Sequence, residues 1–291
     1  MSFHVIVTGA GGFAGGVIAR SLSSKGMTVT ATTRSSELPQ GQERLTWLRA
    51  DLREQNCLPK QFDALVHCAA EIPARCPDPV ELYQRNYEAA NSVFAQAAAA
   101  KVRTVIFLSS MSVYGAITVP EVSEDTPRHN PDPYGRAKFD AEVALSSLVE
   151  AGLKSGLSVR LPGTVGRGSH NNFLSASLGR ILAGETVRAR NPDAMFNNIV
   201  YVGDLADFIA DSIVTLHPGY AVTNLAASEP VRVRDVYSLL FRSAELPEKI
   251  EYDGDGKGAF TISIKRALSL GYRAPSVRQS VTSFVRDVVA T

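Results

Sequence analysis

The hydrophobic positions of the chain up to Arg160 alternate between short β-type runs and longer segments with helical spacing. Runs rich in apolar and β-branched residues predict strands at 4–8, 28–33, 45–49, 64–68, 104–108 and 157–161. Longer segments predict helices at 13–24, 79–100 and 133–150. Strands that alternate with helices are typical of βαβ units, so we expect an α/β fold with a doubly wound parallel sheet.

Beyond Arg160 the pattern loosens into clusters of Gly, Asn and Pro with short helical segments. This change is typical of a smaller lobe that is assembled from the end of the chain. We therefore expect a first domain over residues 1–165. Residues 166–291 are expected to form mainly a small C-terminal substrate-binding lobe, with some return of the chain to the first domain.

Composition narrows the classes of partner. The 291 residues include 30 basic and 29 acidic side chains, a formal net charge of +1, so no global field favours nucleic acid or an anionic membrane. No apolar run approaches the ~20 residues of a membrane helix, and the N-terminal stretch lacks a basic leader. Three cysteines, Cys57, Cys68 and Cys76, are too few and too irregularly spaced for a disulfide framework. We expect a cytoplasmic protein that acts on a small molecule.

A glycine turn follows the first predicted strand. Gly9, Gly12 and Gly15 are spaced three apart, and Phe13 and Ala14 begin the predicted helix. Such glycines allow a tight turn, close approach of a pyrophosphate and close packing of helix on strand, while the helix N-terminus attracts the phosphates. A simple tight turn is the alternative. The context of strand, turn and helix predicts a Rossmann-type dinucleotide site.

The end of the second predicted strand indicates which dinucleotide binds. An acidic residue at this point accepts hydrogen bonds from a free ribose 2′-hydroxyl, whereas a basic residue pairs with a 2′-phosphate. Here Arg34 follows the strand, and no carboxylate appears before Glu37. A solvated arginine is the alternative. The pattern favours NADP over NAD.

A hydroxyl, a phenol and an ammonium group form the candidate chemistry. Tyr134 and Lys138 are four residues apart on one face of a predicted helix, and Ser109 and Ser110 end a predicted strand. A phenol with a pKa near 10 holds a proton that it can donate to a developing alkoxide. We expect the neighbouring ammonium to lower that pKa toward neutrality.

These features together resemble the extended short-chain dehydrogenase/reductase family, which includes nucleotide-sugar epimerases, dehydratases and 4-keto reductases. The resemblance covers essentially the whole chain. It rests on Thr8-Gly9-x-x-Gly12-x-x-Gly15, Asp51-Leu52, His67-x-Ala69-Ala70, Asn86, Ser109-Ser110-x-x-Val113-Tyr114-Gly115, Tyr134-x-x-x-Lys138, Arg160, Val202-Gly203-Asp204-Leu205-Ala206 and Asn224-Leu225.

The resemblance implies a role for each matching residue. Tyr134 is the expected general acid/base, Lys138 binds the nicotinamide ribose, and Ser110 positions the carbonyl. The cofactor contacts that it implies elsewhere come from Asp51 and Leu52 on the adenine side, Ala69 and Ala70 beside the cofactor, and Asn86.

The residues after Ser110 separate the reactions of this family. A dehydratase needs an Asp-Glu pair there, and this chain has Met111 and Ser112, so we set dehydration aside. An epimerase usually holds NAD permanently, which fits Arg34 poorly. We expect NADPH-dependent reduction of a keto group on a nucleotide-activated (deoxy)sugar. A nucleotide-sugar 4-epimerase with tightly bound NAD and a non-catalytic NADP-binding sensor are the alternatives.

Two departures from epimerases concern the substrate. Gly163 stands where they commonly carry Asn, and Asn197 stands where they carry an Arg that clamps the nucleotide diphosphate. Loss of a bidentate clamp weakens the expectation of a nucleotide-activated substrate. Arg180, Arg188 and Arg190 can replace it or be solvated.

No metal site is expected. His67 and Cys68 lack a second ligand pair at useful spacing, and Asp253-Gly254-Asp255-Gly256 is interpreted as a turn because later calcium ligands do not follow. The Ala-rich helix near 95–100 and the Tyr-Lys helix either pair with a second subunit in a homodimer or cover the sheet within one chain.

Overall fold

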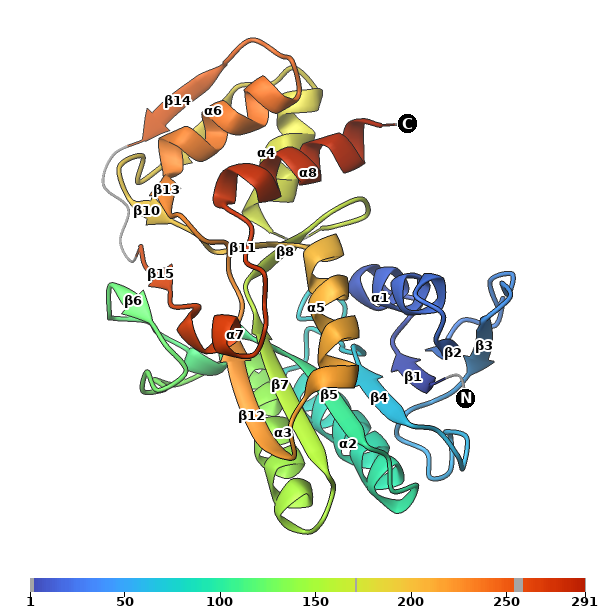
Figure 1. Ribbon diagram of the computed structural model, residues 1–291. Coiled ribbons are helices and arrows are strands. Elements are labelled where there is room, and N and C mark those ends of the chain that lie inside the picture. Colours follow the sequence, from blue (N-terminus) through green and yellow to red (C-terminus); the bar gives the residue numbers. More distant parts are fainter. Residues whose placement is uncertain (1–2, 171, 254–258, 291) are drawn as a thin grey trace. The chain divides into compact units, whose positions relative to one another are not determined.

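The computed structural model describes residues 3–170, 172–253 and 259–290; Gly254, Asp255 and Gly256 lie outside them. The chain divides into two compact units (Figure 1). Unit 1 contains the chain up to Ala116, Pro127–Arg160 and Ala206–Thr223, and unit 2 contains Ile117–Thr126, Leu161–Leu205 and the chain from Asn224. Each unit is thus built from segments that are distant in the sequence.

Unit 1 is organised around a seven-stranded sheet, which confirms the expected α/β class. Its strand order is β3-β2-β1-β4-β5-β7-β12, and the pairs from β3 to β5 are all parallel. The strands are β1 (His4–Thr8), β2 (Thr28–Thr33), β3 (Leu45–Arg49), β4 (Ala64–His67), β5 (Thr104–Ser110), β7 (Ser155–Leu161) and β12 (Gly219–Asn224).

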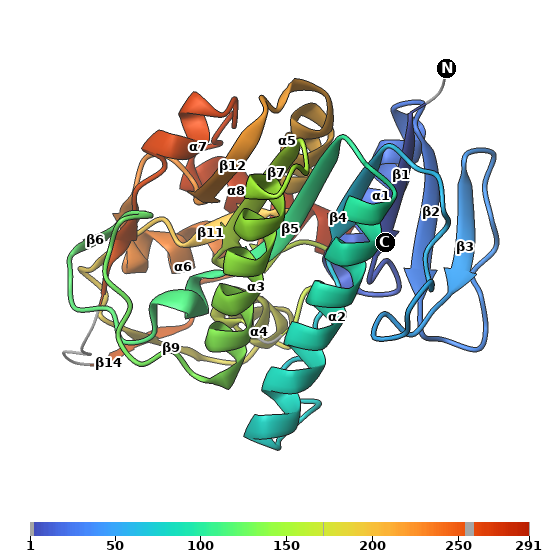
Figure 2. The ribbon, with the colours of Figure 1, turned by 90° about the horizontal axis from the view of Figure 1, so that it is seen from below.

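Helices cover both faces of this sheet. α2 (Pro79–Ala99) and α3 (Pro133–Glu150) lie side by side on one face (Figure 2). Their buried residues share a hydrophobic core with every second residue of the strands, for example Phe94 of α2 with Ile6 and Phe107. α1 (Phe13–Ser24) packs against β1 and β2, and its buried Ile18 and Leu22 are not part of that core, since α1 covers the opposite face.

The strand order reverses between β1 and β4. From β1 the chain runs outward to β2 and β3, and from β4 it runs outward to β5 and β7. Thr8 at the end of β1 is in register with His67 at the end of β4. Ligands of open parallel sheets bind beside the carboxyl ends of the strands at such a reversal. The topology therefore predicts a ligand site at the segments that follow Thr8 and His67.

Unit 2 has its own core, which includes buried residues of three helices such as Leu178, Leu240 and Phe284. Its strands form short pairs rather than a large sheet. The paired strands are β8 (Gly163–Val165) with β11 (Ile199–Tyr201), β9 (Val187–Arg190) with β14 (Ile250–Asp253), β10 (Met195–Phe196) with β13 (Val231–Arg232), and β6 (Glu121–Val122) with β15 (Thr261–Ile262). The helices are α4 (Phe173–Leu182), α6 (Val233–Ser243), α7 (Lys265–Ser269) and α8 (Val277–Val289).

Two further elements complete the chain. α5 (Val202–Thr215) begins in unit 2 and continues in unit 1 from Ala206, and the 3₁₀-helix η1 (Met111–Tyr114) follows β5 in unit 1. Among the residues that the structure describes, no helix combines the length and the apolar character needed to cross a membrane.

Candidate functional site

The glycine turn closes directly onto the segment after β4. Gly9 has a φ of +69°, which favours glycine, and a Cβ atom there would lie 2.6 Å from the backbone N and Cα of Ala69. A Cβ atom on Gly15 would lie 2.5 Å from the carbonyl oxygen of Gly9. Both positions exclude a side chain, so the loop that follows β1 packs closely against helix α1 and the β4 segment.

The start of α1 is open to an anion. Gly12 is the N-cap residue and supplies no side-chain cap, and the first turn contains no acidic residue. The N–H groups of the first turn and the helix dipole therefore offer positive charge at this end of the sheet. Phe13, Ala14 and Gly15 form that first turn. The donor set fits the pyrophosphate of a dinucleotide.

A cavity of about 300 Å³ in unit 1 begins at this turn. It brings together predicted cofactor contacts from five separate segments: Gly9, Gly12, Arg34, Asp51, Leu52, Ala69, Ala70 and Asn86. Phe13, Ala14, Gly15, Ser110, Tyr134 and Lys138 are not among its lining residues. The structure thus brings eight of the predicted cofactor contacts together in one cavity, which supports a dinucleotide site.

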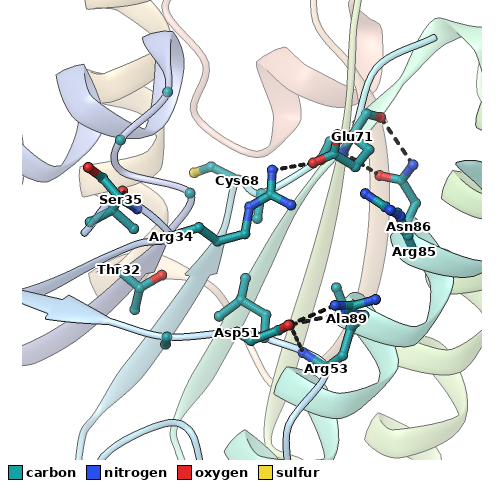
Figure 3. A pocket seen from close by; sticks show the side chains of 18 of the residues that line it. Thr32, Arg34, Ser35, Asp51, Arg53, Cys68, Glu71, Arg85, Asn86 and Ala89 are labelled. Carbon is teal, nitrogen blue, oxygen red and sulfur yellow. Dashed lines mark hydrogen bonds and ion pairs between the residues drawn. The ribbon is translucent and has the colours of Figure 1, made fainter. Parts of the chain in front are cut away.

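Charged residues that the sequence analysis did not select also line the cavity. They are Arg75 and, labelled in Figure 3, Arg53, Glu71 and Arg85. Arg34, which is 65% exposed, donates from Nη2 to Oε1 of Glu71, whose side chain is 11% exposed. Arg34 and Glu71 are 37 residues apart, so no local pattern indicates this pair.

Asp51 is paired with its near neighbour Arg53. Nη2 of Arg53 lies 2.7 Å from Oδ2 of Asp51, and the backbone N and Nε of Arg53 both donate to Oδ1 at 3.1 Å. These hydrogen bonds lower the pKa of Asp51 to about 2. Asp51 is therefore ionised at neutral pH and can accept hydrogen bonds in the cavity.

Asn86 lines the cavity, but its amide group is engaged with backbone. Oδ1 accepts from the backbone N of Glu71 at 3.0 Å, and Nδ2 donates to the carbonyl oxygens of Glu71 at 3.0 Å and Leu82 at 2.8 Å. The side chain thereby fixes the loop after β4 to α2. Asn86 acts on the cavity wall through Glu71.

Tyr134 and Lys138 lie together at the start of α3. Asp132 caps this helix by accepting from the backbone N of Gly135 at 2.7 Å. Nζ of Lys138 is buried, lies 5.7 Å from the centre of the Tyr134 ring, and donates to the carbonyl oxygen of Leu108 at 2.8 Å. The helix spacing predicted from the sequence is present.

Ser110 reaches the same region because α3 and η1 pack without an intervening side chain. Oγ of Ser110 caps η1 by accepting from the backbone N of Ser112 at 3.1 Å. A Cβ atom on Gly135 would lie 2.1 Å from the carbonyl oxygen of Ser112. Gly135, which the sequence analysis did not select, therefore allows the turn that carries Ser110 to lie against the helix that carries Tyr134.

The pKa of Tyr134 differs from the one expected from the sequence. Burial, with the charge of Asp132, raises the pKa of Tyr134 to about 12, and burial lowers the pKa of Lys138 to about 8. The expected lowering of the phenol pKa by the ammonium is not found. Burial of the phenol is the largest cause of the raised pKa, and Nζ of Lys138 is directed to the Leu108 carbonyl. Tyr134 is thus a protonated phenol at neutral pH.

A buried ion pair between Glu142 and Arg160 connects the elements around this region. Oε1 of Glu142 accepts from Ser109 Oγ at 2.5 Å and from Arg160 Nε at 3.0 Å, and Oε2 accepts from Arg160 Nη2 at 2.7 Å. Arg160 Nη1 also donates to the Tyr114 hydroxyl at 2.7 Å. Glu142 lies one turn after Lys138, so the network connects α3 to β5, η1 and β7.

His67 is a packing residue. Its ring stacks on Phe107, and Nδ1 lies 2.7 Å from Oγ1 of Thr8. Burial and the charge of Lys138 lower the pKa of His67 to about 3, so the ring is neutral. In the described part of the chain, no group of three or more His, Cys, Asp and Glu residues is placed to hold a metal ion.

In unit 2, Asn197 is directed into the protein. It is 3% exposed, donates to the carbonyl oxygens of Ala227 and Ile262, and accepts from the backbone N of Ile262 at 2.8 Å. An amide that is committed to three backbone groups does not replace a phosphate-binding arginine. Of the basic residues considered instead, Arg188 is paired with Glu251 at 3.1 Å, and Arg180 and Arg190 are exposed.

Comparison with curated proteins identifies reductases and epimerases. A dTDP-4-dehydro-6-deoxy-D-allose reductase of a Streptomyces species is 26% identical over 277 residues, which cover 86% of this chain and 83% of that enzyme. The N-acetyl-alpha-D-glucosaminyl-diphospho-ditrans,octacis-undecaprenol 4-epimerase of Escherichia coli O157:H7 is 28% identical over 178 residues. That match covers 60% of this chain and only 53% of the epimerase.

Solved structures agree on the fold. The structure of MoeE5 in complex with UDP-glucuronic acid and NAD has a TM-score of 0.81 at 26% identity and covers 98% of both chains. A UDP-N-acetylglucosamine 4-epimerase from Methanobrevibacter ruminantium M1 has a TM-score of 0.83 at 22% identity, a likeness of fold. The family model described as NAD dependent epimerase/dehydratase matches residues 5–218, most of the chain. As its motifs predict, the chain therefore belongs to the NAD-dependent epimerase/dehydratase family of extended short-chain dehydrogenases/reductases.

Proposed function

We propose that this protein is an NADPH-dependent oxidoreductase that reduces a keto group on a nucleotide-activated sugar or deoxysugar. The observation that carries the proposal is Arg34, which follows β2 directly and lines the cavity beside Ser35. A guanidinium and a neighbouring hydroxyl form a donor set suited to a 2′-phosphate. The long match to a dTDP-keto-sugar reductase supports the same class of reaction.

Three side chains would perform the proton chemistry. Tyr134, protonated at neutral pH, donates its proton to the oxygen of the carbonyl that is reduced. Ser110 donates a hydrogen bond to that oxygen and stabilises its developing charge. Lys138 holds the nicotinamide ribose and orients it toward Tyr134. The bound dinucleotide supplies the hydride.

The residues after Ser110 support reduction rather than dehydration. Met111 and Ser112 continue into η1 and carry no carboxyl group. Proton removal at a neighbouring sugar carbon has no base at these positions. Net reduction needs only the single proton of Tyr134.

The alternative function is a nucleotide-sugar 4-epimerase with tightly bound NAD. Two observations favour it: MoeE5, similar over nearly the whole chain, is complexed with NAD and UDP-sugars, and Arg34 already has a carboxylate partner in Glu71. An epimerase regenerates its cofactor in every cycle, whereas a reductase must exchange it.

Cofactor titration tests the proposal. We expect NADPH to bind more tightly than NADH, and we expect Arg34→Asp to reverse this order because a carboxylate repels the 2′-phosphate. Arg49→Asp is the matched control, since Arg49 is an exposed arginine at the end of β3 that does not line the cavity. Equal affinities of the unchanged protein for the two cofactors would contradict the proposal.

A further inference from the structure

Glu71 is a carboxylate that is held in a fixed position on the cavity wall. Its backbone N–H and C=O are both bonded to the side chain of Asn86, each at 3.0 Å. Asn86 is 7% exposed and is itself fixed to Leu82 within α2. The position of Glu71 is therefore determined by a buried helix residue and not by the ion pair that its side chain makes.

Arg34 approaches Glu71 from the other side of the cavity. Figure 3 shows its side chain extending from the segment after β2 toward Glu71. The Arg34 side chain is 65% exposed, whereas that of Glu71 is 11% exposed. The pair thus joins a long, solvated side chain to a nearly buried carboxylate. The arginine is the partner that can move at a low cost in free energy.

Two of the other three arginines of the wall, Arg53 and Arg85, have carboxylate partners of their own. Arg53 is bonded to Asp51, and Arg85 is bonded to Glu81 on α2. Arg34 is adjacent to Ser35, whose side chain also lines the cavity. A phosphate that binds there must compete with Glu71 for the guanidinium, because both are anions that bind the same planar donors.

We propose that Glu71 is a specificity-determining residue that holds Arg34 in the cofactor-free protein and loses it to the 2′-phosphate of NADP(H). The inference rests on the proposed role of Arg34 in NADPH binding. Glu71 lowers the affinity for the phosphorylated cofactor and leaves that for the unphosphorylated cofactor unchanged. Such a competition favours the release that a reductase requires after every turnover.

The test uses nucleotide fragments and does not depend on catalysis. Isothermal titration with 2′,5′-ADP and with 5′-AMP isolates the contribution of the 2′-phosphate. We expect Glu71→Gln to bind 2′,5′-ADP more tightly by on the order of fivefold, which corresponds to the loss of one partly exposed ion pair. The affinity for 5′-AMP stays unchanged. Thermal unfolding confirms that the variant is folded.

Two further variants separate the mechanism from a general effect of charge. Glu81→Gln also removes one negative charge and releases a lining arginine, Arg85, but leaves Arg34 paired. An equal increase in the affinity of this control for 2′,5′-ADP would overturn the proposal. In the background of Arg34→Met, Glu71→Gln should not increase the affinity for 2′,5′-ADP, because there is no longer an arginine for which Glu71 and the phosphate compete. A full gain in that background would also overturn it.

The outcomes distinguish this inference from the proposed function. If the unchanged protein prefers 2′,5′-ADP over 5′-AMP and Glu71→Gln alters nothing, NADPH use stands and the role of Glu71 is wrong. If the unchanged protein shows no preference but Glu71→Gln creates one, Glu71 is the discriminating residue and the assignment of NADPH is wrong. If neither protein discriminates, both are wrong.

Discussion

Tyr134 and Lys138 lie one turn apart on α3, and burial moves their pKa values in opposite directions, to about 12 and about 8. Burial disfavours the charged form of each group, which is the phenolate of one and the ammonium of the other. The phenol is therefore prepared to donate a proton rather than to accept one. This state suits the reducing direction of the proposed reaction.

Replacement of Tyr134 by phenylalanine removes the proton that this residue is proposed to donate and so tests its role as the general acid. We expect Tyr134→Phe to lower kcat by about 100-fold or more, because general acid catalysis is lost, while the affinity for NADPH stays nearly unchanged. The measurements are steady-state turnover and cofactor titration on the same preparation. Tyr87→Phe on α2 is a control with the same chemical change outside the site. Substantial turnover by Tyr134→Phe would require a different acid.

We expect Lys138 to give cofactor binding a pH dependence. Its pKa of about 8 means that the ammonium is present below that pH and is lost above it. We expect the dissociation constant for NADPH to rise as the pH increases through about 8, because the neutral amine holds the ribose less well. Lys138→Met should bind weakly without this dependence, whereas Lys154→Met, at an exposed lysine, should retain it. The same dependence in Lys138→Met would assign it to another group.

The close contact of α3 with η1 determines how the turn that carries Ser110 lies against the helix that carries Tyr134. We expect Gly135→Ala to separate them, because the new Cβ would lie 2.1 Å from the Ser112 carbonyl oxygen. Such overpacking costs about 1–3 kcal/mol of unfolding free energy and displaces Ser110 from Tyr134, so turnover falls as well.

A glycine at an exposed position of a helix provides the matched control for this change. A Cβ atom on Gly179 of α4 would meet nothing within 4 Å. Gly179→Ala should therefore raise the free energy of unfolding by about 0.5–1 kcal/mol through helix propensity. Denaturant unfolding of both variants measures the contrast, and equal effects of the two substitutions would contradict the packing argument.

The elements of unit 1 follow from local pattern, and their contacts do not. β1, β2, β3, α1 and α3 have the bounds that the hydrophobic spacing predicts. β12 (Gly219–Asn224) was not predicted, because its place beside β7 depends on pairing with a distant strand. The pairs Arg34–Glu71 and Glu142–Arg160 join different elements, so no spacing in the sequence indicates them. The sequence therefore predicts the glycine turn and the Tyr-Lys helix but not the charges around them.

For the whole molecule, the proposed chemistry is concentrated in unit 1. The cavity, the network around Glu142, and the Ser110, Tyr134 and Lys138 side chains all belong to that unit. Unit 2 has a core of its own and contains the two departures from epimerases, Gly163 and the inward-directed Asn197. This division agrees with a common cofactor domain and a substrate site that differs from that of the epimerases.

The most direct test of NADPH-dependent reduction is the stoichiometry of cofactor and product. The purified protein is mixed with NADPH and a dTDP-4-keto-6-deoxysugar, while the absorbance of reduced nicotinamide and the amount of product are measured together. We predict a protein that is largely free of cofactor after purification, and equimolar oxidation of NADPH and formation of the reduced sugar. Tightly held NAD that survives purification, with an isomerised product and no net oxidation of cofactor, would contradict the account and identify an epimerase.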